Sequence, residues 1–127
     1  MAKHIIEGKY SHGKNNLEFI LSLIEFNEDD NIIIYSPAID LSGYGKSREE
    51  AQKSFENAME EFYRYTMNKG TFETILKKLG WNIKGSKNKR KYIQPFLDKL
   101  LQEKEYLQEI VREKDFRKFQ HQVNLSC

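Results

Sequence analysis

The sequence predicts an α+β fold, in which helices pack on one face of a small antiparallel sheet. Three observations lead to this class. Apolar residues alternate or run together over residues 17–45, which is typical of strands, and they recur every three or four residues over 51–79, which is typical of helices. The chain has 127 residues, 39% of them hydrophobic, so it can bury one core without disulfides or metal.

Three strands are expected in the first part of the chain. The segment "LEFILSLIEF" (17–26) alternates large apolar side chains, "IIIYS" (32–36) is β-branched and aromatic, and "LSGYGKS" (41–47) is a short strand with glycines. The polar turn "NEDDN" (27–31) joins the first two, so we expect an antiparallel meander. A further short strand is expected around His4–Glu7.

The first helix begins at a recognisable cap. Ser47 followed by Glu50 forms a capping box, in which each side chain binds a backbone N–H of the first turn. Apolar positions from Ala51 to Thr66 then form one face, and Gly70 can end the helix.

The rest of the chain is predicted in four pieces. Residues 71–80 are a second short helix, and "WNIK" (81–84) is a fourth strand, which completes the order β-β-β-α-α-β. The basic segment "KGSKNKRK" (84–91) looks like a linker or an exposed loop. Leucines and other apolar residues then form a helical stripe over 93–113, and residues 114–127 are a strand or a tail.

We therefore expect an α+β domain over residues 1–84, followed over residues 85–127 by a basic linker and a C-terminal helical extension. Residues 1–80 hold 10 Lys or Arg and 13 Asp or Glu, whereas residues 81–127 hold 11 and 6. An acidic front and a basic rear suggest different partners for the two parts, and uneven solvated surface charge is the alternative.

The expected location is the cytoplasm. Cys127 is the one cysteine, which excludes a disulfide within the chain and fits a reducing compartment. The sequence shows no apolar run of signal-peptide or membrane-span length, so we expect no membrane association.

The sequence offers no convincing catalytic set, and we expect neither an enzyme nor a metal or other cofactor. Glu18 and Glu25 have an odd spacing, which puts them on opposite faces of one strand. Asp40 with acids of the first helix is the best remaining metal set, but those acids also suit a solvated helix face and the helix dipole. Cys127 lacks a nearby histidine held by an orienting acid.

A cluster of cations is the one nucleic-acid signal. Its side chains can neutralise phosphates without reading sequence, and the adjoining Tyr92 can stack on a base. The alternative, which we favour, is a solubilising linker. The cluster consists of Lys84, Lys87, Lys89, Arg90 and Lys91.

The helical stripe over 93–113 has two interpretations. It can dock on the sheet, or it can pair with a second chain as a short dimerising helix, although Lys104 interrupts its heptad pattern. We expect a homodimer or a higher homo-oligomer.

One segment resembles a known family. A strand ending in an aromatic residue and a proline, an acidic residue, two glycines and a Ser-x-Glu-Glu-Ala helix start resemble the HicB-like antitoxin family, over roughly residues 17–84. The matching positions are Tyr35, Pro37, Asp40, Gly43, Gly45, Ser47, Glu49, Glu50 and Ala51. The resemblance implies a partial ribonuclease H-like fold.

The resemblance also implies a partner. HicB-like proteins cover a HicA-like toxin, which is a small basic protein of double-stranded-RNA-binding fold that cleaves mRNA. They often carry a C-terminal DNA-binding module that represses their own operon, but residues 92–127 contain no recognisable ribbon-helix-helix or helix-turn-helix. The expected toxin contacts are Tyr35, Asp40, Leu41, Tyr44, Glu56 and Glu60.

Three function classes thus stay open. The first is an antitoxin that neutralises such a toxin and represses its own operon, or a stand-alone HicB-like binding protein. The second is a nucleic-acid-binding regulator that acts through residues 84–91, with or without a toxin, and whose candidate target is operator DNA. The third is a residual hydrolase centred on Asp40.

Overall fold

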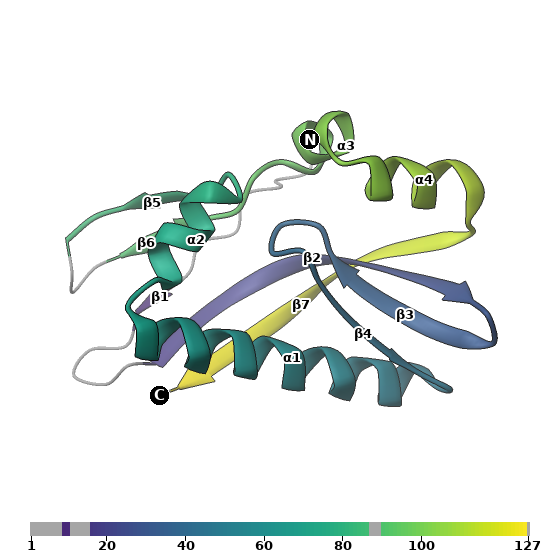
Figure 1. Ribbon diagram of the computed structural model, residues 1–127, viewed down its shortest axis with the longest axis horizontal. Coiled ribbons are helices and arrows are strands. Elements are labelled where there is room, and N and C mark those ends of the chain that lie inside the picture. The colour runs from purple at the N-terminus through teal and green to yellow at the C-terminus, as the bar shows by residue number, and fades with distance from the viewer. Residues whose placement is uncertain (1–8, 11–15, 87–89, 127) are drawn as a thin grey trace.

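The computed structural model describes residues 9–10, 16–86 and 90–126 and has a mixed α+β architecture (Figure 1). The α+β class is therefore confirmed. The strand expected at His4–Glu7 lies outside the described residues. The elements are β1 Lys9–Tyr10, β2 Asn16–Glu28, β3 Asn31–Ser36, β4 Leu41–Gly45, α1 Arg48–Lys69, α2 Phe72–Lys78, β5 Asn82–Lys84, β6 Lys91–Ile93, α3 Leu97–Glu103, α4 Glu105–Glu113 and β7 Phe116–Ser126.

The main sheet is antiparallel and is organised around β2. The predicted meander is present, because β2 pairs with β3 and β3 pairs with β4. On its other edge β2 pairs with β7 from Asn16 to Phe26, and the two-residue β1 pairs with the start of β2. The segment predicted as a strand or a tail is thus an eleven-residue strand of the main sheet, so residues 85–127 are more than a helical extension.

The turn between β2 and β3 is tighter than the five residues that the sequence suggested. Glu28 pairs with Asn31, which leaves two residues in the turn. These are Asp29 and Asp30, with φ of 51° and 68°. Both values lie in the left-handed region that a two-residue hairpin turn of type I′ requires, and aspartate tolerates that region better than most residues do.

Helix α1 begins and ends as predicted. The Glu50 N–H donates to Ser47 Oγ at 3.2 Å, while Glu50 Oε1 accepts from the Lys46 N–H at 2.9 Å. Gly70 ends the helix in the left-handed region, with φ of 69°. The buried face of the helix comprises Ala51, Phe55, Met59, Tyr63 and Thr66.

The two glycines of β4 allow α1 to lie directly on the sheet. A Cβ atom at Gly43 would overlap the backbone of Phe55 and Ala51, and one at Gly45 would lie 2.7 Å from the Ala51 nitrogen. Glycines inside a strand often mark a bulge or a tight turn. The observed role of Gly43 and Gly45 is close approach, since only glycine leaves room for the helix backbone.

Helices cover both faces of the main sheet, which corrects the prediction of helices on one face. Ile34 is paired with Gly43 and therefore points toward α1, so its neighbour Tyr35 points to the opposite face. There the Tyr106 ring of α4 packs against the Tyr35 ring, with centroids 5.0 Å apart. Figure 1 shows α1 on one side of the sheet and α3 and α4 on the other.

The stripe predicted as one helix over 93–113 is broken at Lys104. That residue ends α3 and precedes α4 with extended backbone angles, φ −108° and ψ 115°. The break lets Leu100, Leu107 and Ile110 all be buried against the rest of the protein. Docking is therefore the observed role of this stripe.

The predicted fourth strand, β5, does not join the main sheet. It pairs with β6 in a separate two-stranded hairpin, with Asn82 opposite Ile93 and Lys84 opposite Lys91. The basic segment 84–91 thus begins in β5 and ends in β6, two paired strands, so it is not a linker between two folded parts. Trp81, just before β5, anchors the hairpin because its indole N–H donates to the Ala38 carbonyl at 2.8 Å.

Candidate functional site

Tyr35 and Asp40, two of the expected toxin contacts, form a structural pair. The Tyr35 hydroxyl donates to Asp40 Oδ1 at 2.7 Å, and Lys104 Nζ lies 3.6 Å from the same oxygen. Burial and the adjacent carboxylate raise the pKa of Tyr35, whose side chain is 2% exposed. Asp40 has a φ of 64°, so its contacts hold a left-handed turn after β3. A partner cannot reach Tyr35 without displacing α4, and this corrects its assignment as a contact.

Leu41 and Tyr44 lie on a surface that a partner can reach. Tyr44 is 65% exposed on β4, and Tyr65 is 63% exposed on α1. A shallow hollow of about 650 Å³ lies between Leu41 and the middle and C-terminal half of α1. We define the β4 face as five residues that line this hollow, Leu41, Ala58, Glu61, Phe62 and Tyr65, together with Tyr44, which projects from the opposite face of β4.

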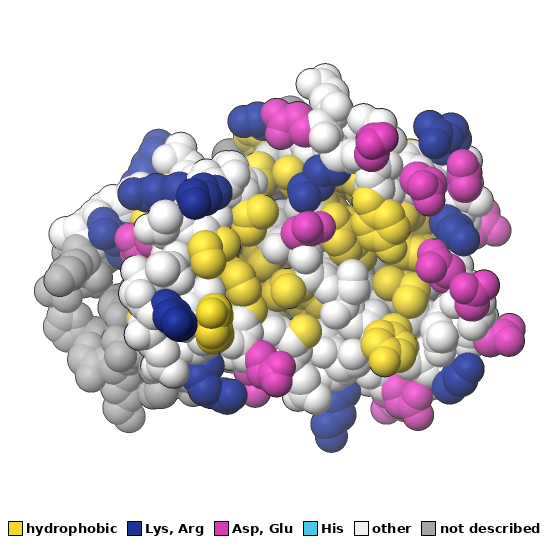
Figure 2. Space-filling model, viewed as in Figure 1, with side chains coloured by type: hydrophobic (Ala, Val, Ile, Leu, Met, Phe, Trp, Pro, Cys, Tyr) yellow, Lys and Arg dark blue, Asp and Glu magenta, His cyan; other side chains and the backbone are white. Residues whose placement is uncertain are grey.

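Figure 2 shows hydrophobic side chains gathered across the side of the molecule that carries β4 and α1, with acidic side chains among them. The β4 face is held rigidly, because the Tyr44 N–H donates to Ser54 Oγ of α1 at 3.1 Å.

Tyr65 and Phe62 were not among the expected contacts. The helical period placed Tyr65 on the buried face of α1 with Phe62, which is wrong, because Tyr65 is 63% exposed whereas Phe62 packs against the core.

Glu56 and Glu60 lie on the opposite side of α1, away from the β4 face. They line a groove between α1 and β7 with a volume of about 190 Å³, together with Phe55, Met59 and residues 121–125. The Glu56 carboxylate lies 3.2 Å from His121 Nε2. We call this the β7 groove. The expected contact residues are therefore divided among the Tyr35–Asp40 pair, the β4 face and the β7 groove.

A charged cluster that sequence reasoning missed joins β2, α1 and β7. Glu25 accepts from Arg48 Nε at 2.7 Å and Nη2 at 2.9 Å, and from Arg117 Nη2 at 2.9 Å. The hydrogen bonds from Arg48, and then those from Arg117, outweigh burial and lower the pKa of Glu25. No local pattern predicts this cluster, because Arg117 is 92 residues from Glu25.

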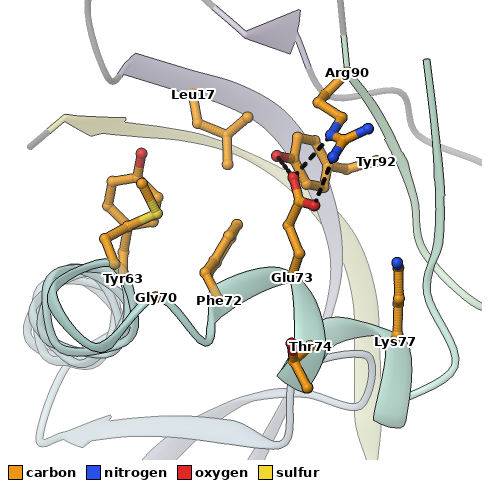
Figure 3. Close-up of a pocket in the computed structure, with 10 residues that line it drawn as sticks. Leu17, Tyr63, Gly70, Phe72, Glu73, Thr74, Lys77, Arg90 and Tyr92 are labelled. Atoms are coloured by element: carbon orange, nitrogen blue, oxygen red, sulfur yellow. Dashed lines mark hydrogen bonds and ion pairs between the residues drawn. The ribbon is translucent and has the colours of Figure 1, made fainter. Parts of the chain in front are cut away.

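A second cluster ties the basic hairpin to α2 (Figure 3). Arg90 donates to both carboxylate oxygens of Glu73, at 3.0 and 3.1 Å, and to the Gly85 carbonyl at 2.6 Å. The Tyr92 hydroxyl donates to Glu73 Oε2 at 2.8 Å. Tyr92 is 3% exposed, so the base stacking suggested by the sequence would require the hairpin to open.

This cluster borders a cavity of about 560 Å³. In Figure 3 the carboxylate of Glu73 faces Arg90 and Tyr92, while Leu17, Tyr63 and Phe72 supply an apolar wall. The polar groups of Glu73, Arg90 and Tyr92 bind one another, so this cluster links α2 to the hairpin. Of the five predicted nucleic-acid contacts, Lys84 and Lys91 are exposed, Arg90 is held by Glu73, and Lys87 and Lys89 lie outside the described residues.

Within residues 9–10, 16–86 and 90–126, no three or more His, Cys, Asp or Glu side chains are grouped to hold a metal ion. Among the helices described, none has the length and apolar character to cross a membrane. Comparisons with protein-family models, with curated proteins and with solved structures found no match to this chain.

Proposed function

We propose that this chain is a non-enzymatic, antitoxin-like protein that binds and neutralises a HicA-like, mRNA-cleaving toxin in the cytoplasm. The observation that carries the proposal is the β4 face, where Tyr65, 63% exposed, borders a hollow between Leu41 and α1, and Tyr44, 65% exposed, projects from the other face of β4. The HicB-like motif supplies the partner class, because β4 and the start of α1 are the segments that carry the resemblance.

The β4 face has the chemistry of a protein-binding surface. Tyrosine is enriched at binding hot spots because it supplies a large apolar area with few rotatable bonds and a polar hydroxyl. The side chains of Tyr44 and Tyr65 are outside the buried core, and the Lys69 ammonium lies over the Tyr65 ring, 5.6 Å from its centroid. Substituting these residues should therefore affect binding more than folding.

Two acidic side chains near the hollow suit a basic partner. Glu61 borders the hollow together with Arg64, and Asp40, which pairs with Lys104, lies just before β4 with 56% of its side chain exposed. Acidic side chains around an apolar centre attract a basic protein and orient it during encounter. In this mechanism the toxin is inactivated because the β4 face covers its RNA-binding surface.

The test uses the product of the adjacent reading frame, which we expect to be a basic protein of about 60–90 residues, the size of a small single domain. Calorimetry should show binding to the wild-type chain and at least about tenfold weaker binding to the Tyr44→Ser and Tyr65→Ser variants. Thr74→Ser, an exposed position on α2, is the matched control and should bind normally. No binding by the wild-type chain, or unchanged binding by both tyrosine variants, would overturn the proposal.

The same preparation tests the nucleic-acid alternative. Repression of its own operon would require the chain to bind operator DNA, and the β5–β6 hairpin is where the cations gather. A gel shift on the upstream DNA that weakens with salt and with loss of Lys84 and Lys91 would favour the regulator. The absence of a shift at low salt would remove it.

A further inference from the structure

β7 has one edge that no other described strand occupies. β7 pairs with β2 in an unbroken register from Asn16 opposite Ser126 to Phe26 opposite Phe116. Within the described part of the chain, no strand pairs with the other edge of β7. An edge strand of eleven residues presents a row of unpaired backbone N–H and C=O groups, which is a template for another strand.

The sequence of β7 does little to block such pairing. Proteins usually protect an edge with proline, a bulge or inward charges. β7 contains no proline and its register with β2 shows no bulge. Arg117 and Lys118 lie at one end of the strand, and residues 119–125 contain no Asp, Glu, Lys or Arg.

We propose that a second copy of this chain pairs with this edge, β7 against β7, in an antiparallel register centred on His121. His121 is the midpoint of Phe116–Ser126, so this register is the one that pairs the whole strand with its copy. The dimer joins the two main sheets into one continuous sheet, with α1 of both copies on the same face. This proposal is independent of the toxin partner, because the β4 face lies on the other side of α1.

The side chains that face each other in this register are compatible. On the α1 face, Phe119 lies opposite Val123 of the second copy, which is a favourable aromatic and β-branched pair. On the other face, Gln120 lies opposite Gln122, and Lys118 lies opposite Asn124. None of these pairs places two like charges opposite each other. The side-chain amides of Gln120 and Gln122 face each other, and the amide of Asn124 faces the Lys118 ammonium.

The β7 groove receives the second copy. Because Phe119 of the second copy is opposite Val123 on the α1 face, its ring enters the groove beside Met59. Arg117 of the second copy lies opposite Leu125, which lines the groove with Glu60, while its guanidinium group already donates to Glu25 of its own chain. Glu25 already binds two arginines, whereas no described cation forms an ion pair with Glu60.

Light scattering coupled to gel filtration tests the dimer, because it measures the mass of the wild-type chain and of variants that carry charged residues at the two exposed glutamines, Gln120 and Gln122. The wild-type chain should have twice the 15.1 kDa mass of one chain. The double variant Gln120→Lys with Gln122→Lys opposes lysines at both symmetric pairs and should raise the dimer Kd by about tenfold or more. The matched variant Gln120→Glu with Gln122→Lys pairs opposite charges and should remain dimeric.

Both glutamines are exposed on the face away from α1, so circular dichroism should report the same fold in all three proteins. A wild-type chain that stays monomeric at about 100 µM, far above the Kd expected for a specific dimer, would overturn the proposal. So would a double-lysine variant as dimeric as the wild type, since the interface would then lie elsewhere. Loss of the dimer in both variants would contradict the register.

Discussion

The two outer strands of the main sheet differ in what they present. β4 has five residues, including two glycines beneath α1; its Leu41 borders a shallow hollow against α1, and its Tyr44 is exposed on the other face. β7 has eleven residues, no glycine, and exposes backbone along a straight edge. The comparison teaches that one sheet can offer two kinds of interface, one based on side-chain recognition and one on strand pairing.

On the β4 side of the sheet, the largest loss of stability is expected from a substitution at Gly43. We expect Gly43→Val to lower the free energy of unfolding by at least about 3 kcal/mol, because the added atoms overlap the backbone of α1 and neither element can move aside cheaply. Urea denaturation measures the loss.

Gly70→Ala is the control for Gly43→Val. A Cβ at Gly70 meets open space, so it should cost only about 1 kcal/mol, for the left-handed backbone. Equal losses in the two variants would show that close approach is not what selects glycine in β4.

On the β7 side, a smaller loss of stability is expected from a substitution at Glu25, whose carboxylate binds Arg48 of α1 and Arg117 of β7. Glu25→Gln should lower the free energy of unfolding at pH 7 by about 1 kcal/mol, since Arg48 and Arg117 lose their charged acceptor and both are largely exposed.

The effect of Glu25→Gln depends on pH in a defined direction. The pKa of Glu25 is lowered in the folded protein, so its stabilisation is present above the ordinary value of 4.5 and is lost as the pH falls through the lowered pKa. The difference between wild type and variant should therefore be constant near neutral pH and vanish in acid. A difference that grows in acid would contradict this account.

The sequence predicts the β4 side well because its signals are local. Ser47 caps α1, apolar residues repeat along it, and Gly70 ends it, all within one segment. The pairing of β7 is not local, since its residues lie between 90 and 110 positions from their partners in β2. Val123 and Leu125 alone indicated alternation, which does not identify a partner strand.

The candidate contacts were harder to predict than the fold for a related reason. Tyr35 follows a β-branched run and precedes the proline of the motif, which marks a strand end but not the face to which the side chain points. Its burial depends on α4, and α4 can dock there only because the helical stripe breaks at Lys104. Tyr44, on a strand without a covering helix on that face, remained exposed.

Amide hydrogen exchange of the chain, alone and with the adjacent frame's basic product, tests most directly that the β4 face binds the toxin. The account predicts added protection in residues 41–45 and 58–68 and none in β7 or the β5–β6 hairpin. Protection that appears in residues 82–93 or in residues 116–126 while the β4 face exchanges as before would contradict it.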